Sequence, residues 1–304
     1  MPGELRQRCC RLSVPIFRLV FRLFSLTLIL DKTMSIITQL PGKTAENLRK
    51  IRAGTPLVHN ITNFVVMNYT ANVLLALGAS PVMAHAAGEV EEMVGMAGSL
   101  VLNIGTLTDR WVDAMVLAGR RATALGRPII LDPVGAGATA LRTAAARRIL
   151  AETRVSVVRG NASEVLSLGN DAAAGRGVDA VHAVDEAVEV AGRLAISLQT
   201  TLAVTGKVDL VTDGERAVRI ANGHPLMTAV TGTGCSATAI IGAFLAVDPD
   251  PLSAAATGLA CFNIAGEIAG EKAVGPGSFM INLLDALYNL RPEEAAERSR
   301  FSTA

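Results

Sequence analysis

Two patterns of hydrophobic and polar positions alternate along the chain after residue 55. Short, almost uniformly apolar runs are separated by longer segments in which apolar residues return at helical spacing. The apolar runs have few polar alternate positions, which indicates strands covered on both faces. The alternation predicts an α/β fold with a mainly parallel central sheet and helices on both faces. We predict strands at 56–61, 80–84, 100–105, 128–133, 155–160 and 201–206, and helices at 63–77, 109–126, 141–151 and 185–199.

The pattern changes in the last third of the chain. The segment KVDLVTDGERAVRIANG (207–223) consists of two alternating runs around Asp213-Gly214, which predicts a β-hairpin that adds an antiparallel edge to the sheet. Helical patterns follow at 234–247, 251–272 and 279–290. No repeat, low-complexity tract or Pro/Ser-rich linker divides residues 34–304, so we predict a single domain there.

Residues 1–33 differ from the rest because six basic side chains stand there against two acidic ones. An Arg-rich, acid-poor start is typical of an organelle transit peptide or a membrane-surface helix. The alternative is that Met34 is the true start. We expect Met34 to be the true start, because the regular pattern of apolar and polar residues begins only after residue 33. Arg18 and Arg22 interrupt the apolar stretch, so we predict no membrane span and no stable membrane association.

Composition excludes some classes of function. The net charge is +1 and the chain has one Trp, two Tyr and eight Phe, so neither an overall field nor aromatic platforms favour nucleic acid. None of the cysteines forms a CxxC pair or a zinc-ligand spacing with histidine. We therefore expect a reducing, cytoplasmic location. The four cysteines are Cys9, Cys10, Cys235 and Cys261.

Polar or glycine-rich residues follow most of the predicted strands. Ligands of open α/β sheets bind outside the carboxyl ends of the strands, so these residues are the first candidates for a site. Each alone is ordinary loop chemistry, and it is their repetition that indicates function. They are Asn60, Asn63, Met83, Asn103, Asp132, Arg159, Asn161, Glu164 and Thr205.

Gly232-Thr233-Gly234 leads into a predicted helix. Backbone N–H groups at such a helix start suit phosphate oxygens. A tight turn that needs glycine for positive φ is the alternative, and the three residues alone favour it. No GxxxxGK[ST] pattern occurs, so the segment is not a Walker A loop.

Asp132 and Glu164 are the acidic candidates for magnesium, which usually takes one or two carboxylates and leaves its other positions to water and phosphate. Asp132 is equally suited to a turn before Pro133, and Glu164 to the first turn of a helix. Arg159 directly follows a strand and suits a phosphate clamp or a surface ion pair.

Cys235 is the unusual residue of the set. At a helix N-terminus, we expect the pKa of its thiol to fall below the usual ~8.5, which would make it reactive. The alternative is a small apolar residue that fills space.

Together these segments resemble the hydroxyethylthiazole kinases. The resemblance covers roughly residues 38–290. Its segments occur in the order found in that family: PLVHNITNFVVMNYTANVLLALGASPVMAHA, LNIGTLT, LDPVGAGAT, RGNASE, GRGVD, VTGKVDLVTDG, PLMTAVTGTGC and GPGSF. It implies a ribokinase-like, three-layer αβα fold. It also implies ATP-dependent phosphorylation of the primary alcohol of 4-methyl-5-(2-hydroxyethyl)thiazole, which salvages the thiazole half of thiamine.

The resemblance also implies roles for matching residues. On the substrate side, Met83 corresponds to a thiazole contact, Gly232 to the substrate side of the anion hole, and Asn60 and Asn63 to the segment that closes the thiazole pocket. On the nucleotide side, Arg159 and Thr205 correspond to ATP contacts, and Glu164 to an Asn-x-x-Glu acid that organises Mg²⁺, usually through water, with Asp132 as a second acid. A homotrimer with the thiazole site at a subunit interface is implied as well.

Cys235 stands where many ribokinase-like enzymes have the aspartate base of a Gly-x-Gly-Asp motif. Phosphoryl transfer needs alignment and charge neutralisation more than a strong base. We therefore expect Cys235, beside Gly232, Thr233 and Gly234, to assist catalysis without being indispensable. Three other functions are compatible with the fold: a kinase of another small alcohol such as the pyrimidine half of thiamine, a lyase that repairs hydrated nicotinamide cofactors, and a nucleotide sensor without turnover.

Overall fold

A computed structural model describes residues 35–169 and 184–304 of the chain. The expectations for residues 1–33 lie outside this range. The first described element is a helical segment at 35–54, which precedes the first strand.

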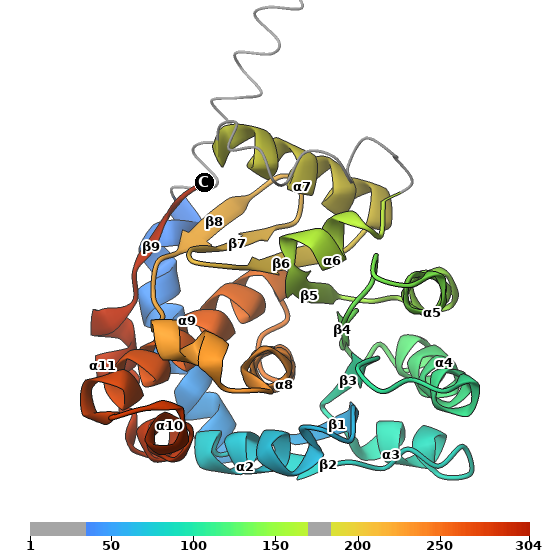
Figure 1. Cartoon of the computed structure of the whole chain (residues 1–304), viewed down its shortest axis with the longest axis horizontal. Coiled ribbons are helices and arrows are strands. Elements are labelled where there is room, and N and C mark those ends of the chain that lie inside the picture. The colour runs from blue at the N-terminus through green and yellow to red at the C-terminus, as the bar shows by residue number, and fades with distance from the viewer. Residues whose placement is uncertain (1–34, 170–183) are drawn as a thin grey trace, which may run out of the picture.

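The strands form one nine-stranded sheet with the order β2-β1-β3-β4-β5-β6-β7-β8-β9 (Figure 1). Neighbouring strands from β2 to β6 are parallel, and β7, β8 and β9 continue the sheet in antiparallel pairing. The predicted mainly parallel sheet and its antiparallel hairpin edge are therefore confirmed. The strands are β1 (Leu57–Ile61), β2 (Ser80–Val82), β3 (Ser99–Asn103), β4 (Ile129–Asp132), β5 (Val157–Asn161), β6 (Thr201–Thr205), β7 (Asp209–Thr212), β8 (Ala217–Ile220) and β9 (Phe301–Thr303).

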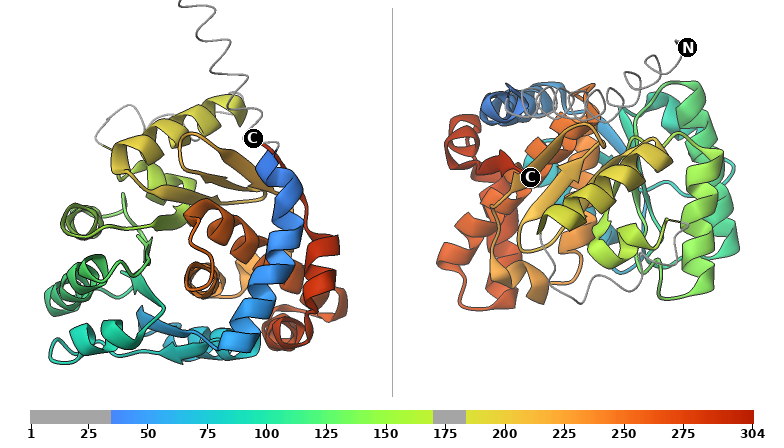
Figure 2. Two further views of the ribbon diagram at one scale, coloured as in Figure 1. Left: turned by 180° about the vertical axis from the view of Figure 1, so that it is seen from behind. Right: turned by 90° about the horizontal axis from the view of Figure 1, so that it is seen from above.

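Helices cover both faces of this sheet and make three layers (Figure 2). One face packs against the helical segment 35–54, α2 (Met67–Leu77), α8 (Thr233–Leu245), α9 (Pro251–Lys272), α10 (Pro276–Asn289) and α11 (Pro292–Arg298). The other packs against α3 (Val90–Met96), α4 (Asp109–Ala124), α5 (Ala140–Glu152), α6 (Ala162–Leu166) and α7 (Val184–Leu198).

The strand β3 shows why the apolar runs lack alternation. All five of its residues are buried, and Leu100 and Leu102 join one hydrophobic core while Val101 joins the other. Because successive side chains of a strand point to opposite faces, a strand between two helical layers needs apolar residues at every position.

The helix α9 is long and apolar enough to cross a membrane by length and composition alone. However, 89% of its most apolar stretch is buried inside the protein, where it packs against α8 and α10. A helix that is apolar all round is the expected centre of such a layer.

The predicted helix 63–77 is wrong at its start. Residues 63–66 are not helical and α2 begins at Met67, because the Asn63 side chain is tied to the end of β3 and to α8. The sequence pattern also missed several short elements near chain reversals, since one or two turns give little periodicity. These are α3, α6, the 3₁₀ helix η2 (Pro225–Ala229), α11 and β9.

Candidate active site

A chain of side-chain hydrogen bonds links Cys235 to Asp132 across the carboxyl ends of β1, β3 and β4. Asn63 Nδ2 lies 3.4 Å from Cys235 Sγ and donates to Asn103 Oδ1 at 2.8 Å. Asn103 Nδ2 in turn donates to Asp132 Oδ2 at 2.9 Å. Parallel strands bring these residues together because their carboxyl ends lie on one edge of the sheet.

Asp132 is a buried carboxylate at the centre of this edge, with 1% of its surface exposed. Its Oδ2 accepts a 2.8 Å hydrogen bond from Thr238 Oγ1 of α8, and Arg159 Nη1 lies 3.7 Å away. Burial raises the pKa of Asp132 to about 6, although Arg159, Thr238 and Asn103 all favour the charged form. The carboxylate therefore carries its charge near neutral pH at a cost in folding free energy.

The N-terminus of α8 faces the same region and is built around two glycines. Gly232 is the N-cap at φ +88°, and a Cβ there would lie 2.7 Å from Val66 Cγ1, so no other residue fits without strain. A Cβ on Gly234 would lie 2.7 Å from Arg159 Nη1. No side chain caps this helix, so its first-turn N–H groups are suited to an anionic ligand.

Thr233 contributes its backbone and not its hydroxyl to this helix start. Thr233 Oγ1 donates to Met227 O at 2.7 Å and approaches Val230 O at 3.1 Å, which fastens α8 to the preceding segment.

The expectation of a lowered thiol pKa at Cys235 is wrong. Burial and, after it, the charge of Asp132 raise its pKa to about 11, although hydrogen bonds from Asn103 and Asn63 and the charge of Arg159 act in the opposite direction. The thiol is therefore protonated at neutral pH. It is suited to hold a hydrogen bond rather than to act as a thiolate.

A pocket of about 720 Å³ opens beside Arg159 and Gly234. Arg159 Nη2 donates to Thr205 Oγ1 at 2.6 Å, so the two residues carried over from the resemblance are in direct contact. Arg159 Nε is buried without a hydrogen-bond partner in the described part of the chain. The pocket continues along β6, the 221–228 segment and α9, with room for a molecule larger than a single phosphate.

Asp209 closes one wall of this pocket. It accepts hydrogen bonds from Gly206 N at 2.9 Å and from Asn263 Nδ2 at 2.7 Å, and burial raises the pKa of its carboxyl. These bonds tie the end of β6 to α9 and give the wall a fixed shape.

Glu164 lies in the first turn of a helix, the structural role named above as the alternative to binding magnesium. It forms a capping box with Asn161 at the start of α6, in which Asn161 N donates to Glu164 Oε2 at 2.9 Å. Its other oxygen accepts a 2.8 Å hydrogen bond from Gly135 N, in the loop after β4. The charge of Glu164 raises the pKa of Asp132, which shows that the two carboxylates act on one another electrostatically.

The residues expected on the substrate side are only partly brought together. Asn63 lies beside Cys235, and Met83 follows β2 at the far edge of the parallel strands. Asn60 is not at this rim. It is fully buried within β1, where its Nδ2 donates to Val58 O at 2.9 Å.

Sequence reasoning did not assign roles to Asn103 and Thr238, although both contact Asp132. Asn103 is one of several polar residues at the strand ends, and its sequence position alone does not single it out. Thr238 and Ser236 are both hydroxyl residues in a buried helix that is otherwise mostly apolar, so the sequence marks them as a pair and only the structure shows that Thr238 contacts Asp132.

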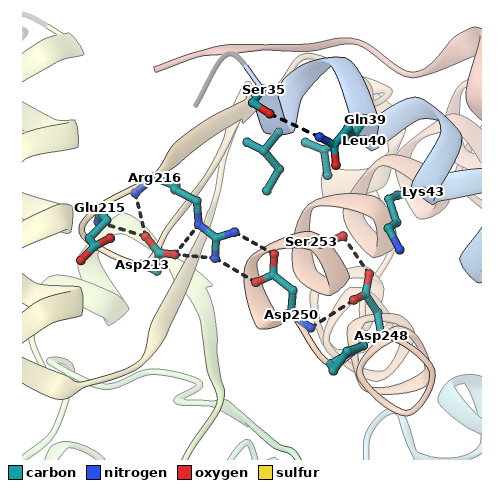
Figure 3. Close-up of a pocket in the computed structure, with 12 residues that line it drawn as sticks. Ser35, Gln39, Leu40, Lys43, Asp213, Glu215, Arg216, Asp248, Asp250 and Ser253 are labelled. Atoms are coloured by element: carbon teal, nitrogen blue, oxygen red, sulfur yellow. Dashed lines mark hydrogen bonds and ion pairs between the residues drawn. The ribbon is translucent and has the colours of Figure 1, made fainter. Parts of the chain in front are cut away.

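A second polar cluster, drawn in Figure 3, lies at the opposite end of the parallel strands, because Asp213 follows β7 beside the amino end of β6. Arg216 donates to Asp250 through Nη1 at 2.8 Å and Nη2 at 2.9 Å, and to Asp213 through Nε at 2.8 Å. The cluster borders an open cavity of about 850 Å³. Because each charge already has close partners, this arrangement is typical of a structural ion pair.

Comparison with known proteins points to one family. Residues 48–293 match the model of the Hydroxyethylthiazole kinase family. The chain is 65% identical over 256 residues to a "Hydroxyethylthiazole kinase" of Desulfotalea psychrophila, which covers 84% of this chain and 94% of the relative. The structure is similar to hydroxyethylthiazole kinase protein from Pyrococcus horikoshii OT3, with 47% identity, a TM-score of 0.78, and coverage of 86% and 98%. A ribokinase-like superfamily protein from Enterococcus faecalis V583 shares the fold at 13% identity and a TM-score of 0.55, covering 76% and 86%.

Proposed function

The chain belongs to the hydroxyethylthiazole kinase family and is a kinase, and we propose that it phosphorylates the primary hydroxyl of 4-methyl-5-(2-hydroxyethyl)thiazole with ATP at the carboxyl ends of its strands. The observation that supports this site most is the Asp132–Arg159 pair: Asp132 accepts a hydrogen bond from Thr238 of α8, and Arg159 lines the pocket of about 720 Å³ beside the uncapped start of that helix. The product, a thiazole phosphate, serves thiamine salvage.

Each part of the site has a task in this reaction. ATP lies in the pocket lined by Arg159 and Thr205, and its γ-phosphate meets the first-turn N–H groups of α8. The thiazole hydroxyl oxygen, held beside Cys235, forms a bond to the γ-phosphorus while the bond from that phosphorus to the β,γ-bridging oxygen breaks, leaving ADP. Arg159 and the helix start stabilise the charge on the transferring group.

The protonation states favour Asp132 as the acceptor of the hydroxyl proton. A thiol with a pKa of about 11 stays neutral, whereas a carboxyl with a pKa of about 6 is ionised at pH 7 and above. We assign Cys235 the role of positioning the hydroxyl. Asn63 and Asn103 connect the two groups and hold them in register.

The donor set fits a magnesium ion held through water and phosphate. Residues 35–169 and 184–304 contain no group of three metal-ligating side chains, so protein side chains alone do not complete a metal site there. Asp132 and Glu164 repel one another electrostatically, and a cation between them would relieve that repulsion. Mg²⁺ suits such a site because it keeps several waters and binds one or two carboxylates together with phosphate oxygens. When bound, it would neutralise charge on the phosphates of ATP.

We also propose that the enzyme is a homotrimer, with the thiazole side of each site completed by a neighbouring copy. Phe64 and Val65, which directly follow Asn63, are 63% and 66% exposed. Apolar side chains of α2 and α10 are exposed as well, and Tyr69 Oη donates to Met280 O at 3.0 Å and joins the two helices. Contiguous apolar surface beside a site is typical of an interface.

A cytoplasmic location is part of the same proposal. Cys235 and Cys261 are both free thiols, which suits a reducing compartment. Small-molecule substrates are expected to be its partners, together with other copies of the chain.

The test is ADP release from ATP and Mg²⁺ by the purified full chain. Three reactions are compared, with hydroxyethylthiazole, with hydroxymethylpyrimidine, and without an alcohol. The proposal predicts release that depends on the thiazole. Release that depends on the pyrimidine instead would favour the rival alcohol kinase, and a folded protein that is silent with both would contradict kinase activity at this site.

A further inference from the structure

Trp111, the only tryptophan of the chain, contacts Phe64 and His85, which lie beside Asn63 and Met83, two residues that the family resemblance implies on the thiazole side. Its ring stacks on His85 with centroids 4.1 Å apart and planes inclined by 27°. It also packs against Phe64, with centroids 4.9 Å apart and an inclination of 56°. His85 follows Met83 by two residues, and Phe64 directly follows Asn63.

Each of these neighbours makes a further hydrogen bond: His85 to Met83, and Phe64 to Thr106 in the loop after β3. His85 Nδ1 donates to Met83 O at 3.2 Å, so the orientation of the imidazole is coupled to the backbone that carries the Met83 side chain. Phe64 N donates to Thr106 Oγ1 at 3.1 Å, which holds the segment after Asn63 against the loop after β3. Trp111 therefore lies between two anchored segments and contacts a ring from each.

The indole itself is rigidly placed. Thr108 caps α4 by accepting a hydrogen bond from Trp111 N at 3.3 Å, and the side chain is only 9% exposed within the core on this face of the sheet. Its Nε1 is buried and has no hydrogen-bond partner among the described residues, so only packing holds the ring face. Aromatic pairs with centroids this close stabilise one another beyond the effect of the surface they bury.

We propose that Trp111 is a positioning residue that sets the separation of the Asn63–Val65 and Met83–His85 segments and thereby the fit of the thiazole ring. This inference rests on the proposed function, because it concerns the alcohol side of that same site. It requires that loss of the aromatic stack weakens binding of the thiazole alcohol and leaves the nucleotide pocket, which lies across α8, unaffected.

The test compares the steady-state kinetics of Trp111→Leu, Trp111→Phe and wild type in the full chain. We expect Trp111→Leu to raise KM for hydroxyethylthiazole about tenfold, which corresponds to about 1.4 kcal/mol, with KM for ATP unchanged. Trp111→Phe keeps an aromatic face and should restore KM to within about twofold, a change of less than 0.5 kcal/mol. Phe244→Leu, a fully buried aromatic in the other core, controls for general loss of packing and should leave both KM values as in wild type.

Fluorescence of wild type gives a second readout that does not need a stable variant. Titration with hydroxyethylthiazole should change the emission of Trp111 saturably, with half-saturation near the KM of the alcohol. Titration with the nucleotide alone should leave the emission unchanged. An unchanged KM in Trp111→Leu, or an emission that does not respond to the thiazole, would overturn the proposal. A wild-type enzyme that does not turn over hydroxyethylthiazole would instead contradict the proposed function.

Discussion

Two carboxylate–arginine clusters lie at opposite ends of the same sheet, and they are built in opposite ways. At the amino end, Arg216 donates from all three guanidinium nitrogens to Asp213 and Asp250 at 2.8–2.9 Å, and the pKa of the arginine is raised by these bonds (Figure 3). At the carboxyl end, Asp132 and Arg159 are 3.7 Å apart, and Arg159 Nε is buried without a partner in the described residues.

The difference separates a structural pair from a functional one. In the Arg216 cluster, charge and hydrogen bonding are matched within the protein, so the cluster stabilises the hairpin turn against the start of α9. In the Asp132 cluster, burial outweighs the nearby positive charge and raises the carboxyl pKa to about 6. The Asp132 carboxylate stays charged at a cost in folding free energy. Because the protein does not fully satisfy this charge, it can still interact with a ligand and with the transition state.

Neutralising the functional carboxylate should have the largest effect on activity. We expect Asp132→Asn to lower kcat by ~10²–10³, the range seen when one buried electrostatic group is removed from an active site. Steady-state ADP release measures this. Asp113→Asn, which removes an exposed carboxylate of α4 that pairs with Arg148, should leave kcat unchanged. Equal activity of Asp132→Asn and wild type would remove Asp132 from the mechanism.

Breaking the structural cluster should instead lower stability. We expect Arg216→Met to reduce the free energy of unfolding by about 2 kcal/mol, because hydrogen bonds to charged groups contribute about that much. The kcat of the folded variant should not change. Denaturant unfolding measures the loss, with Arg193→Met as the matched control, since Arg193 pairs with Glu189 on an exposed face and such pairs contribute little. A large fall in kcat without loss of stability would reverse the two assignments.

Removing the thiol should have a smaller effect than neutralising Asp132. We expect Cys235→Ala to lower kcat about tenfold, the loss of one positioning hydrogen bond of about 1 kcal/mol or slightly more. Cys261→Ala, at the buried free cysteine of α9, provides the control. Complete loss of turnover in a folded, substrate-binding Cys235→Ala enzyme would mean that the thiol is indispensable.

The smallest effect is expected in the nucleotide pocket. Thr205→Val removes the hydroxyl that accepts from Arg159 Nη2 and keeps the side-chain volume. We expect KM for ATP to rise about threefold, as for the loss of less than 1 kcal/mol, with KM for the alcohol unchanged. Thr123→Val, on α4, is the control. A rise in KM for the alcohol with KM for ATP unchanged would place Thr205 on the alcohol side of the site and contradict its assignment to the nucleotide pocket.

The sheet was predictable from sequence because its strands are buried on both faces. Short apolar runs such as LVL in β3, bounded by polar residues, favour buried strands, and the Asp213-Gly214 turn favours a hairpin. The boundaries of α2 and the existence of α3 and α6 were not predictable. Asn63 pairs with Asn103, 40 residues away along the chain, and α6 is a single turn fixed by the Asn161–Glu164 capping box.

For the candidate site, the residue types could be predicted from the sequence, but the pKa values and the directions of the side chains could not. The sequence marked Cys235, Asp132 and Arg159 as candidates because each lies near the end of a predicted strand or the start of a predicted helix. Whether the thiol pKa rises or falls depends on burial and on the Asp132 charge, and neither can be read from the local sequence. In the same way, the pattern HNITN could not show that Asn60 is turned into the sheet while Asn63 faces Cys235.

The most direct test of the contrast between the two clusters is the pH dependence of stability in wild type and Asp132→Asn. The pKa of Asp132 is raised from 3.8 to about 6 in the folded state, so its contribution to stability is fully present below pH 3.8 and is lost as pH rises through 6. This rise in pKa corresponds to roughly 3 kcal/mol of folding free energy. We therefore predict that the difference in free energy of unfolding, wild type minus Asp132→Asn, falls between pH 4 and pH 7 and is flat above. A difference that stays constant, or that rises with pH, would contradict the claim that this end of the sheet holds a buried charge at a cost in stability.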